Sequence, residues 1–160
     1  MFASYVKWRS EQTGMKVLLV SVEHEVAWYE AQRRAVERFD MSPWVKLVHA
    51  PSTWQRHGDR EVVCYDQTQL DRSVTLRDSA PDLVLVDGPV GTRFGGPGRE
   101  GSLLQALSLV KPGGLILLHD ALRREEYEML HSFLRENANV TCKGIVPDAD
   151  GLAVFEKVEN

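Results

Sequence analysis

Cysteine, long apolar runs and an excess of either charge are all scarce in this sequence. Its 160 residues include two cysteines, Cys64 and Cys142, which form neither a CxxC pair nor a zinc-ligand spacing. No apolar run approaches the roughly 20 residues that a membrane-spanning helix needs. The formal net charge is only −4, so the chain has no general attraction to nucleic acid or to an anionic membrane. These absences exclude a disulfide miniprotein and predict no membrane or nucleic acid partner.

Signals for export are also missing from the start of the chain. Met1–Arg9 lacks the charged-then-apolar order and the small-residue cleavage site of a signal peptide. We therefore predict a cytoplasmic protein whose two cysteines are reduced thiols. With 43% hydrophobic and 26% charged residues, the composition is that of an ordinary globular protein. The length predicts a single domain over residues 1–160.

Short apolar runs alternate along the chain with segments of helical periodicity. The predicted strands are Lys16–Val22, Val45–His49, Glu61–Tyr65, Asp82–Val86, Leu115–Leu118, Val140–Val146 and Leu152–Val158. The predicted helices are Phe2–Thr13, Ala27–Phe39, Leu103–Val110 and Arg123–Glu136. This alternation indicates an α/β fold with an open, three-layer, mostly parallel sheet. Turn residues at 147–151 join the last two strands and predict one antiparallel edge strand.

Two segments are predicted to be loops. Residues 53–60 are polar and contain Gly58. The stretch Gly88–Gly101 holds six of the 12 glycines in the chain, which is typical of a loop rather than a packed element. Its arginines, Arg93 and Arg99, either meet an anionic group of a ligand or are solvated.

One helix has a clear predicted apolar face. In Ala27–Phe39, the apolar residues at helical spacing are Trp28, Ala31, Ala35 and Phe39. This side is predicted to face the sheet, because the charged residues of the helix gather on another side.

Ligands of open α/β sheets bind outside the carboxyl ends of the strands, so the residues that follow each strand are the candidate site. Glu23 follows the first apolar strand. Its carboxylate either accepts both hydroxyls of a ribose or lies at the N-terminus of the next helix, where the helix dipole favours an acid.

Three further polar residues follow the strands that end at Val86 and Leu118. Asp87 is a candidate metal ligand, general base or acceptor for an ammonium group, and alternatively a turn residue. Asp120 is a candidate partner in a magnesium site, or else an N-cap. His119 is a candidate general base because its ordinary pKa lies near neutrality, or it bonds to backbone.

Three segments resemble class I S-adenosylmethionine-dependent methyltransferases. The first, Ser21–Glu30, is similar to their second-strand motif. The second, Asp82–Pro89, is similar to their fourth strand. The third, Leu109–Asp120, contains a distinctive Lys-Pro-Gly-Gly turn before their fifth strand. The three occur in the order of the family, so together they predict its Rossmann-like fold.

The resemblance implies a set of cofactor-binding residues. Glu23 would bind the ribose hydroxyls of S-adenosylmethionine, and His24 would lie near the adenosine. Ala50 and Pro51 would lie beside the adenine. Asp87 would face the methionine end or the acceptor.

The resemblance also implies a metal site. In the metal-dependent O-methyltransferases of this class, acids after the fourth and fifth strands help to hold a divalent cation, and Asp87 and Asp120 match those places. The next residue there is commonly Asn, whereas this chain has Ala121.

The glycine-rich cofactor turn of the family has no counterpart here. It would precede the helix before the second strand, which in this chain is already Phe2–Thr13. We therefore expect an N-terminally truncated fold that lacks the first strand and its glycine loop. That strand is normally central, so we also expect a homodimer that covers the unpaired strand edges.

Three functions remain open at this point. The first is S-adenosylmethionine-dependent methyl transfer to a small-molecule hydroxyl or carboxylate, with Asp87 and His119 as catalytic residues. The second is a non-catalytic interaction or remnant domain of the same fold. The third is an unrelated nucleotide-binding enzyme, which the absence of GxGxxG and GxxxxGK[ST] motifs disfavours.

Overall fold

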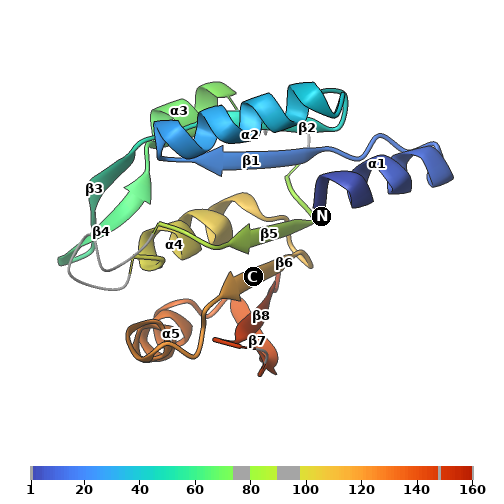
Figure 1. Cartoon of the computed structure of the whole chain (residues 1–160). Coiled ribbons are helices and arrows are strands. Elements are labelled where there is room, and N and C mark those ends of the chain that lie inside the picture. The colour runs from blue at the N-terminus through green and yellow to red at the C-terminus, as the bar shows by residue number, and fades with distance from the viewer. Residues whose placement is uncertain (1, 74–79, 90–97, 148, 160) are drawn as a thin grey trace. The chain divides into compact units, whose positions relative to one another are not determined.

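The computed structural model describes residues 2–73, 80–89, 98–147 and 149–159 (Figure 1). The chain divides into two compact units. Unit 1 comprises Met1–Pro51 and Asp66–Val74, and unit 2 comprises Ser52–Tyr65 and Thr75–Asn160. Each unit is described by itself, and the single domain over residues 1–160 stays a prediction. In the described part of the chain, every helix is too short or too polar to cross a membrane.

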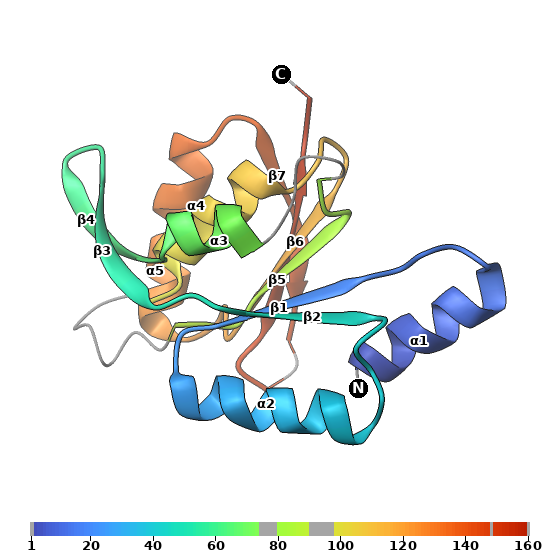
Figure 2. The ribbon, with the colours of Figure 1, turned by 90° about the horizontal axis from the view of Figure 1, so that it is seen from above.

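Unit 1 is a parallel strand pair with helices. Its elements are α1 (Phe2–Thr13), β1 (Leu19–Glu23), α2 (Val26–Arg38), β2 (Val45–His49) and α3 (Gln67–Ser73). The strands β1 and β2 pair in parallel, with Leu19 opposite Val45 and Glu23 opposite His49. The crossover between them is α2, which packs along both strands (Figure 2). The predicted strand–helix–strand order is therefore confirmed here.

The predicted apolar face of α2 is wrong. Trp28 is 63% exposed and Phe39 is 65% exposed, and Ala31 and Ala35 are exposed as well. The adjacent side of the helix is less exposed instead, because Tyr29 packs on the ring of His49 with centroids 5.4 Å apart. Helical periodicity allows two neighbouring faces of this helix, and the contacts with the strands select the more polar one.

Unit 2 contains the larger sheet. Its elements are β3 (Ser52–His57), β4 (Arg60–Tyr65), β5 (Leu83–Val86), α4 (Glu100–Leu109), β6 (Leu115–His119), α5 (Arg124–Glu136), β7 (Val140–Val146) and β8 (Leu152–Lys157). Four strands form a sheet in the order β5-β6-β8-β7. The strands β5 and β6 are parallel, and β8 is antiparallel to both of its neighbours. The predicted open α/β fold with one antiparallel strand is confirmed.

The position of the antiparallel strand needs a correction. We predicted it at the edge, but β8 lies inside the sheet between β6 and β7, and β7 is the edge strand. The reason is burial. Ala153 and Phe155 of β8 are fully buried, whereas most of β7 is exposed, so the more apolar strand takes the inner place.

Residues 53–60 form a hairpin rather than the predicted loop. The strands β3 and β4 are antiparallel, and a two-residue turn at Gly58 and Asp59 connects them. Gly58 has φ +60°, a conformation that glycine adopts without strain. Arg60, at the start of β4, pairs with Glu100 and Glu136 at 2.7 Å each, which ties the hairpin to α4 and α5.

The two helices α4 and α5 cover one face of the four-stranded sheet (Figure 2). The core of unit 2 lies between them and the strands, where Phe133 packs edge-on against Phe155 with ring centroids 5.8 Å apart. On the opposite face of β5, Leu83 and Leu85 stay partly exposed. The helix α4 begins at Glu100, three residues before the predicted start at Leu103.

The Lys-Pro-Gly-Gly turn places β6 beside β5. Gly113 has φ +73°. A Cβ on Gly114 would lie 2.6 Å from Val110 Cγ2 and 3.0 Å from the carbonyl oxygen of Asp82. The two glycines therefore serve different needs: the first turns the chain, and the second lets the backbone approach β5 closely.

Candidate active site

The carboxyl ends of β5 and β6 bring three predicted residues together. Val86 pairs with Leu118, so the residues that follow, Asp87 and His119, come side by side. His119 Nδ1 lies 2.8 Å from Asp87 Oδ1 and 3.2 Å from Asp120 Oδ1. The prediction that these residues share one edge of the sheet is confirmed.

The His119 and Asp87 pair is accessible from solvent. The side chain of His119 is 49% exposed, and that of Asp87 is 60% exposed. When Nδ1 carries the ring proton, it donates to Asp87 and leaves Nε2 with a free lone pair. Within the described residues, no protein group hydrogen-bonds to Nε2. The pair therefore has the geometry of a general base oriented by a carboxylate.

Asp120 differs from its neighbours because it is buried. Its side chain is 5% exposed, and its backbone has φ +61°, in the left-handed region that non-glycine residues rarely adopt. Arg99 donates to Oδ2 at 2.6 Å, and Arg123 Nη1 lies 3.0 Å from the same oxygen. Asp120 thus acts as the anionic centre of a charge cluster rather than as an N-cap, since α5 begins only at Arg124.

Arg99 lies at the centre of this cluster. Its side chain is 4% exposed, and Nη2 also donates to the main-chain oxygen of Asp87 at 3.2 Å. Nη1 lies 3.5 Å from Glu126 Oε1. Burial raises the pKa of the Glu126 carboxyl, and the charge of Arg99 opposes this rise.

Sequence reasoning did not place Arg99 and Glu126 in this cluster. Arg99 was predicted either to meet an anionic ligand or to be solvated, and it is instead buried against protein carboxylates. The one feature of the sequence that could have pointed to Arg99 was its position at the end of the glycine-rich stretch. The middle of that stretch, residues 90–97 with Arg93, lies outside the described residues.

The predicted metal site fits this cluster poorly. Ligand atoms of Asp87, His119 and Asp120 all lie within 4.8 Å of one another, which is close enough to share an ion. However, Asp120 Oδ2 already accepts from Arg99, and Asp87 Oδ1 already contacts His119 Nδ1. Ala121 is fully buried and offers no side-chain oxygen. A magnesium ion would therefore compete with Arg99 and with the ring of His119 for these carboxylates.

The predicted ribose-binding residue Glu23 belongs to unit 1. Its Oε1 accepts from the backbone N–H groups of His24 at 2.8 Å and Glu25 at 2.9 Å, so the carboxylate lies at the start of α2. The two interpretations of Glu23 are compatible, because this arrangement engages one oxygen only. Ala50 is fully buried and Pro51 is exposed, and both stay predicted adenine contacts.

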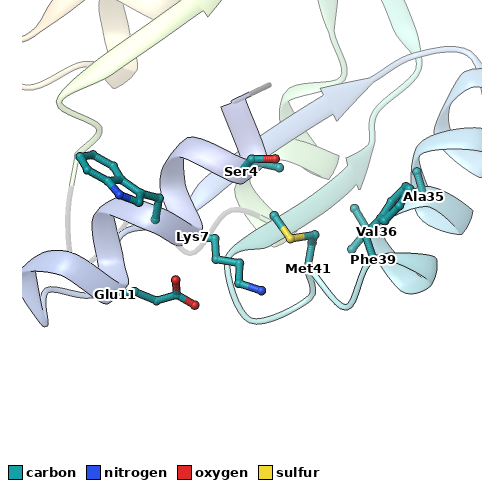
Figure 3. A pocket seen from close by; sticks show the side chains of 9 residues that line it. Ser4, Lys7, Glu11, Ala35, Val36, Phe39 and Met41 are labelled. Carbon is teal, nitrogen blue, oxygen red and sulfur yellow. The ribbon is translucent and has the colours of Figure 1, made fainter.

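A groove of about 590 Å³ lies in unit 1 between α1 and α2 (Figure 3). Its lining is mostly apolar and includes Trp8, Val36, Phe39 and Met41. Lys7 and Glu11 of α1 are the charged residues of this lining. The groove contains none of the predicted site residues, and its residue types suit an apolar contact rather than acid–base chemistry.

The alternation of strands and helices, the inner antiparallel strand and the polar residues at the carboxyl ends of parallel strands are features of a Rossmann-like methyltransferase fold. No protein-family model matches the sequence, and no curated protein matches it either. Solved structures do match: a methyltransferase from Geobacter sulfurreducens is 14% identical with a TM-score of 0.55, and the match covers 89% of this chain and 59% of that one. The chain thus spans less than two thirds of that neighbour.

Two further neighbours are O-methyltransferases by name. A putative caffeoyl-CoA O-methyltransferase from Staphylococcus aureus is 12% identical, with a TM-score of 0.59 and coverage of 98% of this chain and 82% of that one. An O-methyltransferase from Bacillus cereus in complex with SAH is 12% identical, with a TM-score of 0.51 and coverage of 98% and 80%. The predicted resemblance to class I methyltransferases is therefore confirmed at the level of the fold.

Proposed function

We propose that this chain transfers a methyl group from S-adenosylmethionine to a hydroxyl or carboxylate of a small molecule. The observation that carries the proposal is the 2.8 Å contact between His119 and Asp87 at adjacent strand ends, in a fold shared with methyltransferases. Such a pair can accept the proton that a hydroxyl loses when its oxygen is methylated.

The residues at the end of β1 fit the nucleoside part of S-adenosylmethionine. The backbone N–H groups of His24 and Glu25 hold Oε1 of Glu23. Within the described residues, nothing hydrogen-bonds to Oε2, so this oxygen is available to a ribose hydroxyl. We propose Glu23, His24, Ala50 and Pro51 as the nucleoside contacts. The bound cofactor would supply an electrophilic methyl group on a sulfonium.

The residues of this chain would then remove one proton, that of the acceptor hydroxyl. His119 Nε2 would accept it from the acceptor hydroxyl as that oxygen takes the methyl group, and the cofactor would leave as a neutral thioether. Asp87 stabilises the imidazolium that results and keeps the ring in the correct orientation. A carboxylate acceptor needs no base, so the dependence of the rate on His119 distinguishes the two acceptor types.

Calorimetric titration with S-adenosylhomocysteine and S-adenosylmethionine tests the proposal. We expect saturable binding that Glu23→Ala weakens at least tenfold, because the variant removes the ribose contact. Glu37→Ala is the matched control, since Glu37 lies on the exposed surface of α2 and pairs with Arg33. Absence of binding to the wild-type chain would instead support the non-catalytic alternative, which the structural neighbours do not favour.

A homodimer is part of the same proposal. Within unit 1, β1 pairs only with β2, and within unit 2, β5 pairs only with β6 among the described strands. An unpaired strand edge is a template for pairing with another chain. Light scattering at increasing concentration is expected to show a dimer, and a monomer at all concentrations would contradict this part of the proposal.

A further inference from the structure

The buried guanidinium of Arg99 lies among three carboxylates, those of Asp87 and Asp120 after β5 and β6 and that of Glu126 on α5. Nη2 is 2.6 Å from Asp120 Oδ2 and 3.4 Å from Asp87 Oδ1, and Nη1 is 3.5 Å from Glu126 Oε1. Such a set of acids, held close together, would repel one another without a positive charge between them. Arg99 supplies that charge from a buried position between the acids, whereas Arg123 contacts only Asp120 among the three and does so from a half-exposed position.

We propose that Arg99 takes the place of a divalent metal ion, so that the strand-end site works without one. A metal ion and a guanidinium are both positively charged, and either can neutralise the carboxylates of Asp87 and Asp120. They also exclude each other. A divalent ion that entered the site would lie close to a buried positive charge and would compete with Arg99 for the carboxylate of Asp120.

Arg99 also fixes the geometry of the strand ends. Its contact with the main-chain oxygen of Asp87 at 3.2 Å holds the backbone after β5, and its bond to Asp120 accompanies the left-handed backbone after β6. Asp87 Oδ1 lies between Arg99 Nη2 and His119 Nδ1. Arg99 is thereby a positioning residue for the imidazole, because it acts on His119 through Asp87.

Metal binding tests this inference without measuring turnover, so its failure is distinguishable from failure of the proposed methyl transfer. The probe is Mn²⁺, followed by electron paramagnetic resonance and by the unfolding temperature. We expect the wild-type chain to bind no Mn²⁺ at this site. Arg99→Met keeps the apolar bulk of the side chain but removes its charge, and we expect it to bind one Mn²⁺ and to unfold at a higher temperature when Mn²⁺ is added.

Two further variants locate the gained site. Arg99→Lys retains a positive charge, so it is expected to bind no Mn²⁺. The double variant Arg99→Met with Asp87→Asn lacks one ligand and is expected to lose at least tenfold of the gained affinity. A folded Arg99→Met variant that binds no Mn²⁺ would overturn the proposal.

The wild-type chain decides the question even if Arg99→Met fails to fold. Mn²⁺ binding by the wild-type chain that Asp120→Asn abolishes would overturn the proposal, and absence of such binding supports it. The positioning role has its own readout in the ¹⁵N NMR signals of the His119 ring. We expect a folded Arg99→Met variant to change the position of the ring proton and Arg99→Lys to keep it on Nδ1 as in the wild type. A ring that stays unchanged in Arg99→Met would contradict a positioning role for Arg99.

Discussion

The two units contain similar sequence patterns but differ in how they bury them. In unit 2, the strands β6 and β8 each have a neighbour on both edges, and their apolar residues enter a core with α4 and α5. In unit 1, the sheet has two strands, and α2 has no buried residue. An amphipathic helix beside a strand therefore forms a closed core only where enough strands lie beneath it.

The two units also hold their functional carboxylates differently. Glu23 in unit 1 is held by backbone N–H groups, whereas Asp120 in unit 2 is held by the side chains of Arg99 and Arg123. Backbone donors come from adjacent residues, but the arginines come from other positions in the chain. A substitution far along the chain from Asp120, such as one at Arg99, is thus expected to disturb the site of unit 2, whereas the contacts of Glu23 depend on the residues next to it.

The largest expected effect is on the proposed chemistry at the end of β6. His119→Gln removes the base but keeps a side chain of similar size, so we expect the methyl transfer rate to a hydroxyl acceptor to fall about 10²–10⁴-fold. Formation of S-adenosylhomocysteine measures the rate. His57→Gln, on the β3–β4 hairpin, is the control and is expected to leave the rate unchanged. Equal rates for wild type and His119→Gln would exclude His119 as the base.

Two phenylalanines, one in each unit, test the difference in burial between the units. Phe155→Ala opens the core of unit 2 and is expected to lower the free energy of unfolding by about 3–5 kcal/mol. Phe39→Ala removes a ring that is mostly exposed in unit 1 and is expected to cost about 0.5 kcal/mol or less. Urea denaturation compares the two. Similar losses would show that unit 1 buries this ring in solution.

Adjacent glycines of the turn before β6 should respond differently to a methyl group. Gly114→Ala places a Cβ against backbone and Val110, so we expect a loss of about 1–3 kcal/mol in unfolding free energy. Gly113→Ala meets no atom within 4 Å and has only the strain of its positive φ, about 1 kcal/mol. Thermal unfolding of both variants measures the two losses. A larger loss of stability in Gly113→Ala than in Gly114→Ala would contradict this account.

The smallest expected effect concerns the pH dependence of stability in unit 2. Burial raises the pKa of Glu126 in the folded chain, so the unfolded chain releases this proton at lower pH than the folded chain does. The wild type should therefore lose stability relative to Glu126→Gln as the pH rises from the ordinary glutamate range through the raised pKa. Unfolding free energies at several pH values measure this difference, and a constant difference would show that the folded pKa is not raised.

Much of the fold followed from local patterns. The bounds of α1, β2 and β7 agree with the predicted Phe2–Thr13, Val45–His49 and Val140–Val146. The location of Asp87 and His119 at the carboxyl ends of strands also followed. Their hydrogen bond to each other was not predicted. The predicted strand Glu61–Tyr65 corresponds to β4. Its partner β3 was missed since its residues are mostly polar. The sheet-facing side of α2 was missed since two faces of the helix fit the same periodicity.

The charge cluster shows where sequence reasoning ends. Asp87, Arg99 and Asp120 lie 12 and 21 residues apart, and no periodicity of a helix or strand relates them. Their contacts depend on the start of α4 reaching the ends of β5 and β6. A carboxylate pair at strand ends is compatible with a metal site, whereas the buried arginine between its members is the observation behind our proposal of a metal-free site.

The sequence by itself determined most of the strands and helices, though not β3 or α3, and which polar residues stand at the strand ends, because these properties depend on neighbours along the chain. Only the tertiary structure decided that β8 lies inside the sheet and that a guanidinium binds Asp120, because both depend on which surfaces are buried when distant segments pack together. An unpaired charge is costly when it is buried, so the buried Asp120 is stable only with the guanidinium of Arg99 beside it.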